Sequence, residues 1–196
     1  MSFTKSMITK QQKIIKRIFD FVFSLLGLLL LGWLIVFLIL IAGFDTQAFG
    51  LFIQKRIGLN GKLFHIFKIR TYKNKGQQLT TSTFGDFLRN SKLDELPQLV
   101  NVLLGNMSFV GPRPDIVGFA DMLTGENRLI LSVKPGITGP ASIYFKNEEK
   151  LLQKEVNPEE YNKAFIWPKK VEINLNYVKN YSLKKDLLCI FNTLFS

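Results

Sequence analysis

The chain has 196 residues, a net charge of +11 and a sequence pI of about 9.8. A positive balance of this size fits nucleic acid, an anionic membrane surface or phosphorylated substrates as partners. A single cysteine excludes an internal disulfide, and one cysteine with one histidine cannot build a zinc site of the usual kind. The phosphate-binding patterns G-x-G-x-x-G and Walker A are absent, as is the nucleophile pattern G-x-S-x-G.

The first predicted element is an uncharged, mostly apolar run of 24 residues at positions 21–44. As one straight helix it would measure roughly 36 Å, at about 1.5 Å per residue, against about 30 Å of hydrocarbon in a bilayer. A secretory signal peptide is excluded, because the run is too long and no small-residue cleavage site follows it. The run therefore predicts a membrane helix within residues 13–44.

Positive charge flanks this run on both sides. The basic residues are Lys5, Lys10, Lys13, Lys16 and Arg17 before it, and Lys55, Arg56, Lys62, Lys68, Arg70, Lys73 and Lys75 after it. Because positive flanks favour the cytoplasmic side, a single crossing would place one cluster outside. We therefore favour a re-entrant helix, which enters and returns with breaks at Gly27 and Gly32, over a spanning one.

Strand character follows at residues 49–72, interrupted by Gly58-Leu59-Asn60-Gly61. An Asn-Gly pair between apolar runs is typical of a β-hairpin. Residues 74–83 are interpreted as a polar connection, and residues 84–90 as a short helix.

Apolar residues recur at helical spacing from Leu96 to Leu104, and Gly105 predicts the end of that helix. Pro97 fits its first turn, where the missing N–H is not needed. This places Asp94 and Glu95 at the N-terminal end of the helix.

The remaining chain is predicted to be mainly helical, at residues 115–131, 148–154, 158–165 and 169–195, with a break near 180–182. The last segment is basic, amphipathic and rich in Phe, which fits either the membrane interface or core packing. The predicted fold is α+β and mostly helical, with a membrane helix, a small β-hairpin and amphipathic interface helices. We expect a membrane-associated part at residues 1–48 and a cytoplasmic catalytic domain at 49–196.

Asp94 and Glu95 are the first candidates for chemistry. Adjacent carboxylates at a helix start are often only caps that oppose the helix dipole. The functional interpretation needs cations nearby, and the chain offers Lys68, Arg70, Arg89 and Arg113, the last held between two prolines. Carboxylates and arginines together suit a diphosphate with a divalent cation, and one carboxylate could attack phosphorus.

Several motifs make the chain similar to bacterial sugar transferases of the monotopic polyprenyl-phosphate phosphoglycosyl transferase type. They lie at residues 16–20 (KRIFD), 54–58 (QKRIG), 67–71 (FKIRT), 88–98 (ending in LDELPQ), 101–103 (NVL), 105–114 (GNMSFVGPRP) and 134–139 (KPGITG). The resemblance covers nearly the whole chain, from about Lys16 to Thr193.

The resemblance implies transfer of a sugar 1-phosphate from a UDP-sugar to polyprenyl phosphate, with release of UMP. Asp94 would attack the β-phosphorus and hold the phospho-sugar covalently, Glu95 would assist, and Mg²⁺ would bind at Asp94 and the diphosphate. Lys68 and Arg113 match the family's functional lysine and phosphate-binding arginine. The expected place is the cytoplasmic face of the bacterial inner membrane, where the chain would start the assembly of a glycan.

The expected partners follow from this resemblance together with the apolar run and the positive charge. They are the UDP-sugar, polyprenyl phosphate, membrane lipids, downstream glycosyltransferases and a second copy of the chain, whereas nucleic acid is not expected. Gly32-Trp33 stands where relatives commonly carry a helix-breaking Ser-Pro pair, and Pro140-Ala141-Ser142 follows the last motif where many have an aromatic residue and Gln. The alternative function is an inactive membrane-tethered scaffold with a decayed site.

Overall fold

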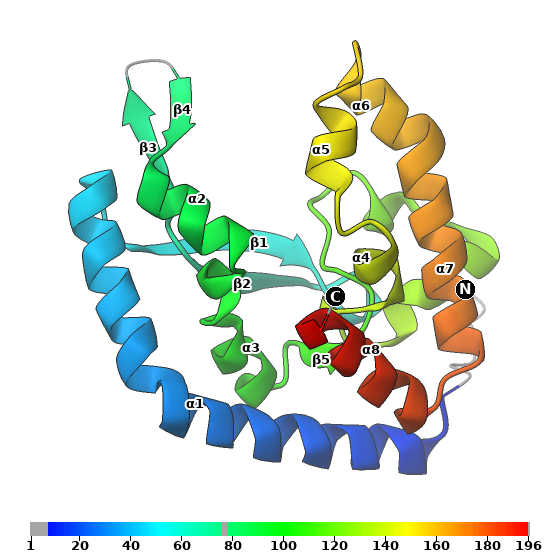
Figure 1. Ribbon diagram of the computed structural model, residues 1–196. Helices are drawn as coiled ribbons and strands as arrows, with labels where there is room; N and C mark the ends of the chain where they lie inside the picture. Colours follow the sequence, from blue (N-terminus) through cyan, green and yellow to red (C-terminus); the bar gives the residue numbers. More distant parts are fainter. Residues whose placement is uncertain (1–7, 76–77, 196) are drawn as a thin grey trace. The chain divides into compact units, whose positions relative to one another are not determined.

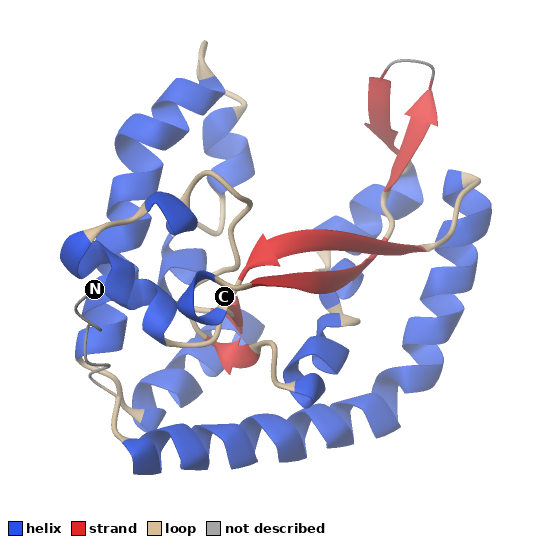
Figure 2. Ribbon diagram, turned by 180° about the vertical axis from the view of Figure 1, so that it is seen from behind, coloured by secondary structure: helices blue, strands red, loops and turns tan. Residues whose placement is uncertain are grey.

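The computed structural model describes residues 8–75 and 78–195, which form two compact units. Unit 1 takes its described residues from Met1–Arg17, Ile57–Lys62 and Ser108–Ser196, and unit 2 takes them from Ile18–Arg56 and Leu63–Met107. Helices dominate, and the strands form three separate two-stranded pairs (Figure 2). The α+β, mostly helical class predicted from the sequence is confirmed, while the division at residues 48 and 49 stays a prediction.

The apolar run lies in one helix, α1 (Lys10–Thr46), which bends along its course (Figure 1). Of the part of the chain that the structure describes, α1 is the one helix long and apolar enough to cross a membrane. Leu29 and Trp33 each expose at least 70% of their surface, as lipid-facing side chains would.

None of the three glycines of α1, Gly27, Gly32 and Gly43, interrupts the helix, so the breaks predicted at Gly27 and Gly32 are wrong. A Cβ on Gly27 would lie 3.2 Å from a methyl of Leu99, whereas one on Gly32 would meet nothing within 4 Å. Gly27 therefore lets the helix approach Leu99 closely. One glycine costs a helix only about 1 kcal/mol, which the packing of its flanks can offset.

The predicted hairpin is confirmed: β1 (Leu51–Ile57) pairs with β2 (Leu63–Ile69) through the 3₁₀ turn η1 (Leu59–Gly61). Asn60 and Gly61 have φ values of 57° and 80°, the left-handed conformation that this residue pair tolerates best.

The polar connection expected at residues 74–83 is wrong. There, β3 (Tyr72–Lys75) pairs antiparallel with β4 (Gln78–Thr81). The ladder is made by backbone groups, so it forms without the apolar alternation on which the prediction depended. The expected helix follows as α2 (Thr83–Asn90), where the Ser82 hydroxyl accepts a hydrogen bond from the Gly85 N–H and caps the first turn.

Unit 1 pairs β5 (Ser108–Val110) with β6 (Gly136–Thr138) in parallel. The helix expected at residues 115–131 is wrong in type: two 3₁₀ segments, η3 (Ala120–Met122) and η4 (Gly125–Ser132), take its place. Gly118 and Gly125 have φ values of 100° and 57°, which an α-helix cannot accommodate.

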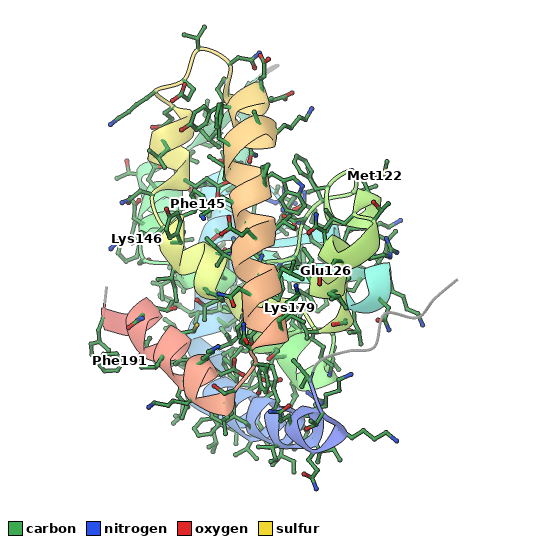
Figure 3. All side chains as sticks on the ribbon, turned by 90° about the vertical axis from the view of Figure 1, so that its right-hand side faces the viewer. Met122, Glu126, Phe145, Lys146, Lys179 and Phe191 are labelled. Carbon is green, nitrogen blue, oxygen red and sulfur yellow. The ribbon has the colours of Figure 1, made fainter. Side chains whose placement is uncertain are left out.

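The later helices largely follow the prediction. The predicted ones are α5 (Glu148–Leu152), α6 (Pro158–Tyr161) with the π turn η5 (Asn162–Ile166), α7 (Trp167–Lys179) and α8 (Leu183–Phe195), whereas α4 (Pro140–Tyr144) was not predicted. The predicted break at residues 180–182 separates α7 from α8. Figure 3 looks onto α7 and shows Lys179 beside Glu126 of η4, with which it forms a 2.7 Å ion pair.

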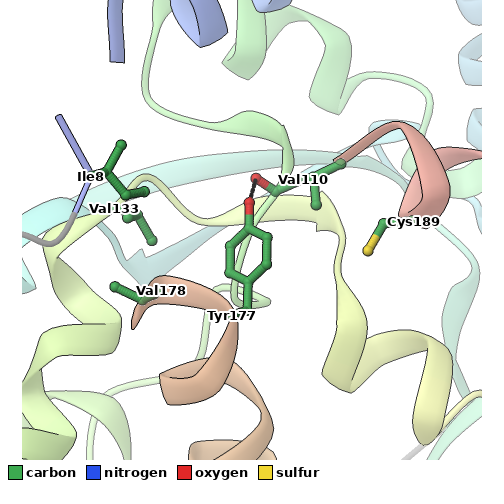
Figure 4. Packing of buried hydrophobic residues seen from close by; sticks show 6 residues of the cluster. All are labelled: Ile8, Val110, Val133, Tyr177, Val178 and Cys189. Carbon is green, nitrogen blue, oxygen red and sulfur yellow. Dashed lines mark hydrogen bonds between the residues drawn. The ribbon is translucent and has the colours of Figure 1, made fainter. Parts of the chain in front are cut away.

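Each unit has its own buried apolar cluster. In unit 2, Leu38 and Ala42 of α1 pack with Ile69 of β2 and Leu88 of α2. In unit 1, a cluster around Tyr177 of α7 includes Ile8, Val110, Val133, Val178 and Cys189 (Figure 4). Burial raises the pKa of the Tyr177 phenol and of the Cys189 thiol, so both stay protonated at neutral pH.

A buried ionic network adjoins the cluster in unit 1. The Asp186 carboxylate of α8 accepts hydrogen bonds from Lys16 Nζ at 2.5 Å, Tyr177 Oη at 2.6 Å and Tyr181 Oη at 3.2 Å. The side chains of Lys16 and Asp186 are only 11% and 3% exposed. The network therefore ties the first turns of α1 to the C-terminal helices.

Candidate active site

The predicted carboxylate pair lies on a 3₁₀ turn, η2 (Leu93–Glu95), ahead of the helix α3 (Gln98–Leu104). The helix begins later than expected, at Gln98, while Gly105 ends it as predicted, with a φ of 84°. Lys92, with a φ of 59°, turns the chain from α2 into η2. Asp94 and Glu95 are each only 8% exposed, so neither is an ordinary solvated cap.

Asn101 fastens α3 to the strand that carries Lys68. Its amide nitrogen donates to the His65 carbonyl at 2.7 Å, and its amide oxygen accepts from the Phe67 N–H at 3.0 Å. The Asn101 side chain is fully buried, and these two bonds satisfy both ends of its amide. The turn η2, which carries Asp94 and Glu95 and is called the carboxylate turn below, is thereby held at a fixed spacing from β2.

This spacing brings Lys68 to the carboxylate pair. Lys68 Nζ lies 3.0 Å from Glu95 Oε1, and the two side chains are 18% and 9% exposed. A partly desolvated pair of this kind interacts more strongly than a surface ion pair. The sequence-based association of Lys68 with Asp94 and Glu95 is thus matched by their positions in unit 2.

The electrostatics single out Asp94. Its pKa is raised by burial and by the neighbouring Glu95 carboxylate, while Lys68, Lys92 and Arg89 act in the opposite direction. Its Oδ1 is buried and has no hydrogen-bond partner within the described residues. A buried carboxylate oxygen without a partner is costly, and active sites retain such groups for a ligand or a reacting atom.

The two predicted arginines of unit 2 differ in their surroundings. Arg89, in the last turn of α2, stacks its guanidinium 4.9 Å from the Tyr72 ring centre and contributes to the field at Asp94. Arg70 instead donates from Nε to the Phe49 carbonyl at 2.8 Å and lies over the Phe52 ring. The structure thus gives Arg70 a role in packing the hairpin, and its assignment to phosphate stays a prediction.

Arg113 belongs to unit 1 and is exposed, on the loop after β5 between the buried Pro112 and Pro114. That loop crosses the segment 134–139 at backbone distance: Gly111 N–H donates to the Thr138 carbonyl and Gly136 N–H to the Pro112 carbonyl, both at 2.9 Å. A Cβ on Gly111 or Gly136 would come within 2.5 Å of backbone atoms of the other segment. Gly111 and Gly136, which belong to two different motifs, therefore allow the two segments to cross in close contact. The loop that carries Arg113 is fixed by this crossing.

No group of three or more His, Cys, Asp or Glu side chains that could hold a metal occurs in residues 8–75 and 78–195. Mg²⁺ does not need such a cage, because it usually binds one or two carboxylates together with substrate phosphates and water. The unpartnered Asp94 Oδ1 beside Glu95 fits that mode.

Two polar residues of α3, Gln98 and Asn101, lie in the sequence motifs but have no role assigned from the sequence. Both are fully buried, which for amide side chains requires partners or a function. Their signal was their position on a helix otherwise built from Leu and Val.

Known proteins are similar to this chain over most of its length. The family model described as bacterial sugar transferase matches residues 11–196. The chain is 34% identical over 187 residues to the uncharacterized sugar transferase EpsL of Bacillus subtilis, covering 90% of this chain and 85% of EpsL. It is 33% identical over 198 residues to the UDP-glucose:undecaprenyl-phosphate glucose-1-phosphate transferase of Escherichia coli, covering 93% of this chain and 40% of that protein.

A third relative, the galactosyl transferase CpsE of Streptococcus agalactiae, is 29% identical over 202 residues, covering 92% of this chain and 41% of CpsE. The chain thus spans most of EpsL but only about two fifths of the two longer relatives.

Proposed function

The chain belongs to the bacterial sugar transferase family, and on that premise we propose that it transfers a sugar 1-phosphate from a UDP-sugar to polyprenyl phosphate. The observation that carries this proposal is the buried Asp94 carboxylate, with one oxygen unpartnered, beside the Lys68–Glu95 pair. The similar protein from E. coli is named for the same reaction with UDP-glucose. The retained pair also disfavours the alternative of an inactive scaffold.

The proposed reaction has two displacements at phosphorus. In the first, a carboxylate oxygen of Asp94 attacks the β-phosphorus of the UDP-sugar, and the bond from that phosphorus to the bridging oxygen breaks, so UMP leaves with the bridging oxygen. In the second, a phosphate oxygen of polyprenyl phosphate attacks the same phosphorus and expels the Asp94 carboxylate. The product is a polyprenyl diphosphate sugar. In each displacement the negative charge of the attacking oxygen is transferred to the leaving oxygen, so the charge balances.

The surrounding residues have defined parts in this scheme. Lys68, held by Glu95, places a positive charge at the attacking carboxylate and lowers the pKa of Asp94, which increases its ionised fraction. Asp94, with the diphosphate of the donor, would hold Mg²⁺, whose chemistry is to neutralise charge on the phosphate oxygens. Glu95 orients Lys68 through the 3.0 Å contact.

The test of this function is product analysis. Protein purified in detergent is given undecaprenyl phosphate and, separately, UDP-glucose, UDP-galactose and their N-acetylamino counterparts. We expect UMP to be released from at least one donor. Release should continue beyond one turnover only when the acceptor is present in excess over the enzyme. Release of UDP instead of UMP would contradict phosphoryl transfer and indicate ordinary glycosyl transfer.

We propose further that α1 re-enters and that both its ends face the cytoplasm. At its start, Lys16 pairs with Asp186, and just before it Ile8 packs against Tyr177. At its end, Asp45 accepts a hydrogen bond from the Ser82 hydroxyl and lies 3.8 Å from Lys73. All of these partners follow α1 in the chain.

The chain after α1 contains, within its described residues, no second helix that could cross a membrane. Those partners therefore belong on one side of the bilayer, and a helix anchored to them at both ends is best explained by re-entry. Basic residues on both flanks favour the cytoplasmic side.

Topology labelling tests this proposal. Thr9→Cys and Thr83→Cys, both exposed positions, are placed singly in a Cys189→Ser background, which leaves the flanking charges unchanged. Both cysteines should resist a membrane-impermeant thiol reagent in intact cells and react after permeabilisation. Labelling of Thr9→Cys alone from outside would show that the helix spans.

Lys68→Met should change the pH dependence of turnover. Because Lys68 lowers the pKa of Asp94 and the ionised carboxylate is the nucleophile, its loss raises that pKa. The acidic limb of the kcat/KM profile should therefore move to higher pH. Lys55→Met, which removes an exposed lysine of β1, is the matched control. An unmoved limb in Lys68→Met would contradict the assigned nucleophile or its coupling to Lys68.

Arg113→Lys should lose at least about 10-fold in kcat/KM, because lysine keeps the charge but not the planar fork that binds phosphate through two hydrogen bonds. The loop that carries Arg113 is held by backbone bonds that the change does not touch, so the melting temperature should be unaltered. Arg128→Lys, at another exposed arginine of unit 1, should keep its activity. Wild-type kinetics in Arg113→Lys would make Arg113 a turn residue only.

A further inference from the structure

Of the buried polar atoms in unit 2 that have no hydrogen-bond partner among the described residues, two lie close together in the chain. They are Asp94 Oδ1 and Gln98 Nε2. Gln98 is only 1% exposed, the least exposed side chain among the polar groups around the carboxylate turn apart from Asn101. Asn101, one turn further along, satisfies both ends of its amide. An unpartnered amide at Gln98 therefore requires its own explanation.

The backbone places Asp94 and Gln98 on neighbouring turns. Leu96 (φ −53°, ψ −38°) and Pro97 (φ −61°, ψ −16°) join η2 to α3 in helical conformation. A separation of four residues along such a path keeps the two side chains within little more than one turn of each other along the helix axis. The two groups are also complementary in chemistry, because Oδ1 can only accept or react while Nε2 can only donate.

A purely structural role does not account for Gln98. A buried amide donor without a partner destabilises the folded state, and an apolar side chain of similar length would fill the same space without that cost. The missing partner must accept a hydrogen bond and must fit beside Asp94 Oδ1. A phosphoryl group attached to Oδ1 meets both conditions, since its non-bridging oxygens are strong acceptors.

We propose that the side-chain amide of Gln98 donates a hydrogen bond to a non-bridging oxygen of the phosphoryl group while it is transferred to and from Asp94. The proposal rests on the proposed function and deepens it. Gln98 exchanges no proton and forms no covalent bond; the only bonds that form and break are those at phosphorus already described. The amide stabilises charge on the equatorial oxygens during both displacements.

The central test is Gln98→Met, which keeps the length of the side chain and removes the donor. Because the hydrogen bond forms with the transferring group, kcat should fall about 10²- to 10³-fold, as for other single donors to a developing oxyanion. The KM for the UDP-sugar should stay within a few-fold. Because the variant buries no unpartnered amide, its melting temperature in detergent should equal or exceed that of the wild type.

Gln98→Glu, which is nearly isosteric but presents an anion to the phosphate, should be impaired at least as strongly. Gln153→Met, at an exposed glutamine after α5, is the matched control and should keep the wild-type rate. A Gln98→Met variant with kcat within two-fold of the wild type would overturn the proposal. So would a clear fall in its melting temperature, which would assign Gln98 to the fold.

The wild type serves to separate this inference from the function on which it rests. If the wild type releases no UMP from any UDP-sugar, the proposed function fails before Gln98 is tested. If the wild type is active and Gln98→Met matches it, only the role of Gln98 fails.

Discussion

An Asp94→Asn variant is expected to release UMP at least about 10³-fold more slowly than the wild type, since an amide cannot replace the carboxylate as a nucleophile toward phosphorus. The same variant should fold normally. The rate of UMP release is measured with the best UDP-sugar donor and undecaprenyl phosphate. The variant and the wild type are compared in preparations of equal monodispersity in detergent.

The expected stability of Asp94→Asn follows from the raised pKa of Asp94. A carboxyl whose pKa is higher in the folded state than in the unfolded state favours folding when it is protonated, and this contribution is lost as the pH rises through the folded pKa. At neutral pH the ionised Asp94 therefore disfavours the folded state, and Asn removes that effect. The melting temperature of Asp94→Asn should equal or exceed that of the wild type at neutral pH, with the difference shrinking in acid.

Glu95→Gln is the informative companion variant. It keeps the nucleophile but removes the negative partner of Lys68, so turnover should fall while UDP-sugar still binds. Substantial UMP release by a clean Asp94→Asn preparation would show that another residue, or direct transfer without a covalent intermediate, carries the reaction.

Asp186→Ala should lower the stability of the chain by about 3–5 kcal/mol, since it leaves the ammonium of Lys16 buried without its counter-ion. For a chain of this size, that loss corresponds to a fall in melting temperature of roughly 6–20 °C. Two tyrosine hydroxyls lose their acceptor in the same variant. The measurement is thermal unfolding in detergent, followed by circular dichroism.

The double variant Lys16→Met/Asp186→Leu separates the ion pair from the packing. Replacing both members of a buried pair by apolar side chains is often neutral or stabilising, so the double variant should recover much of the loss. A single Asp186→Ala variant that melts within 2 °C of the wild type would contradict a buried network at this place.

The parts of the fold that were predicted from the sequence depend on local chemistry. Asn60-Gly61 predicted the hairpin because few residue pairs tolerate two successive positive φ values. Gly105 predicted the end of α3 because glycine readily adopts the positive φ at which helices commonly end. The apolar run predicted α1, because an uncharged apolar stretch of this length is typical of a helix in a membrane.

The parts that were missed depend on backbone pairing and on contacts between distant residues. The β3–β4 ladder needs no apolar pattern, and the positive φ values of Gly118 and Gly125 broke a helix that composition alone favoured. The hydrogen bonds from Asn101 to β2 span more than 30 positions in the chain, so no local pattern could indicate them.

The candidate site also contains residues that the sequence identified and residues whose importance is seen only in the structure. Asp94, Glu95 and Lys68 were identified from motif and charge, and the structure brings them together. The sequence identifies Lys16 only as one of the basic residues that flank the apolar run, and its pairing with Asp186 is seen in the structure. Gln98 ends the LDELPQ motif, but only its burial and its unpartnered donor in the structure mark it as a candidate for the site.

The central claim is that Asp94 carries the phospho-sugar as a covalent intermediate, and intact-protein and peptide mass spectrometry test it most directly. The wild type is incubated with its UDP-sugar and Mg²⁺ without polyprenyl phosphate, quenched in acid and digested. We predict one added sugar phosphate on the peptide that contains Asp94, its disappearance when polyprenyl phosphate is added before quenching, and its absence in Asp94→Asn. An active wild type that forms no adduct, or an adduct on a peptide without Asp94, would contradict the claim.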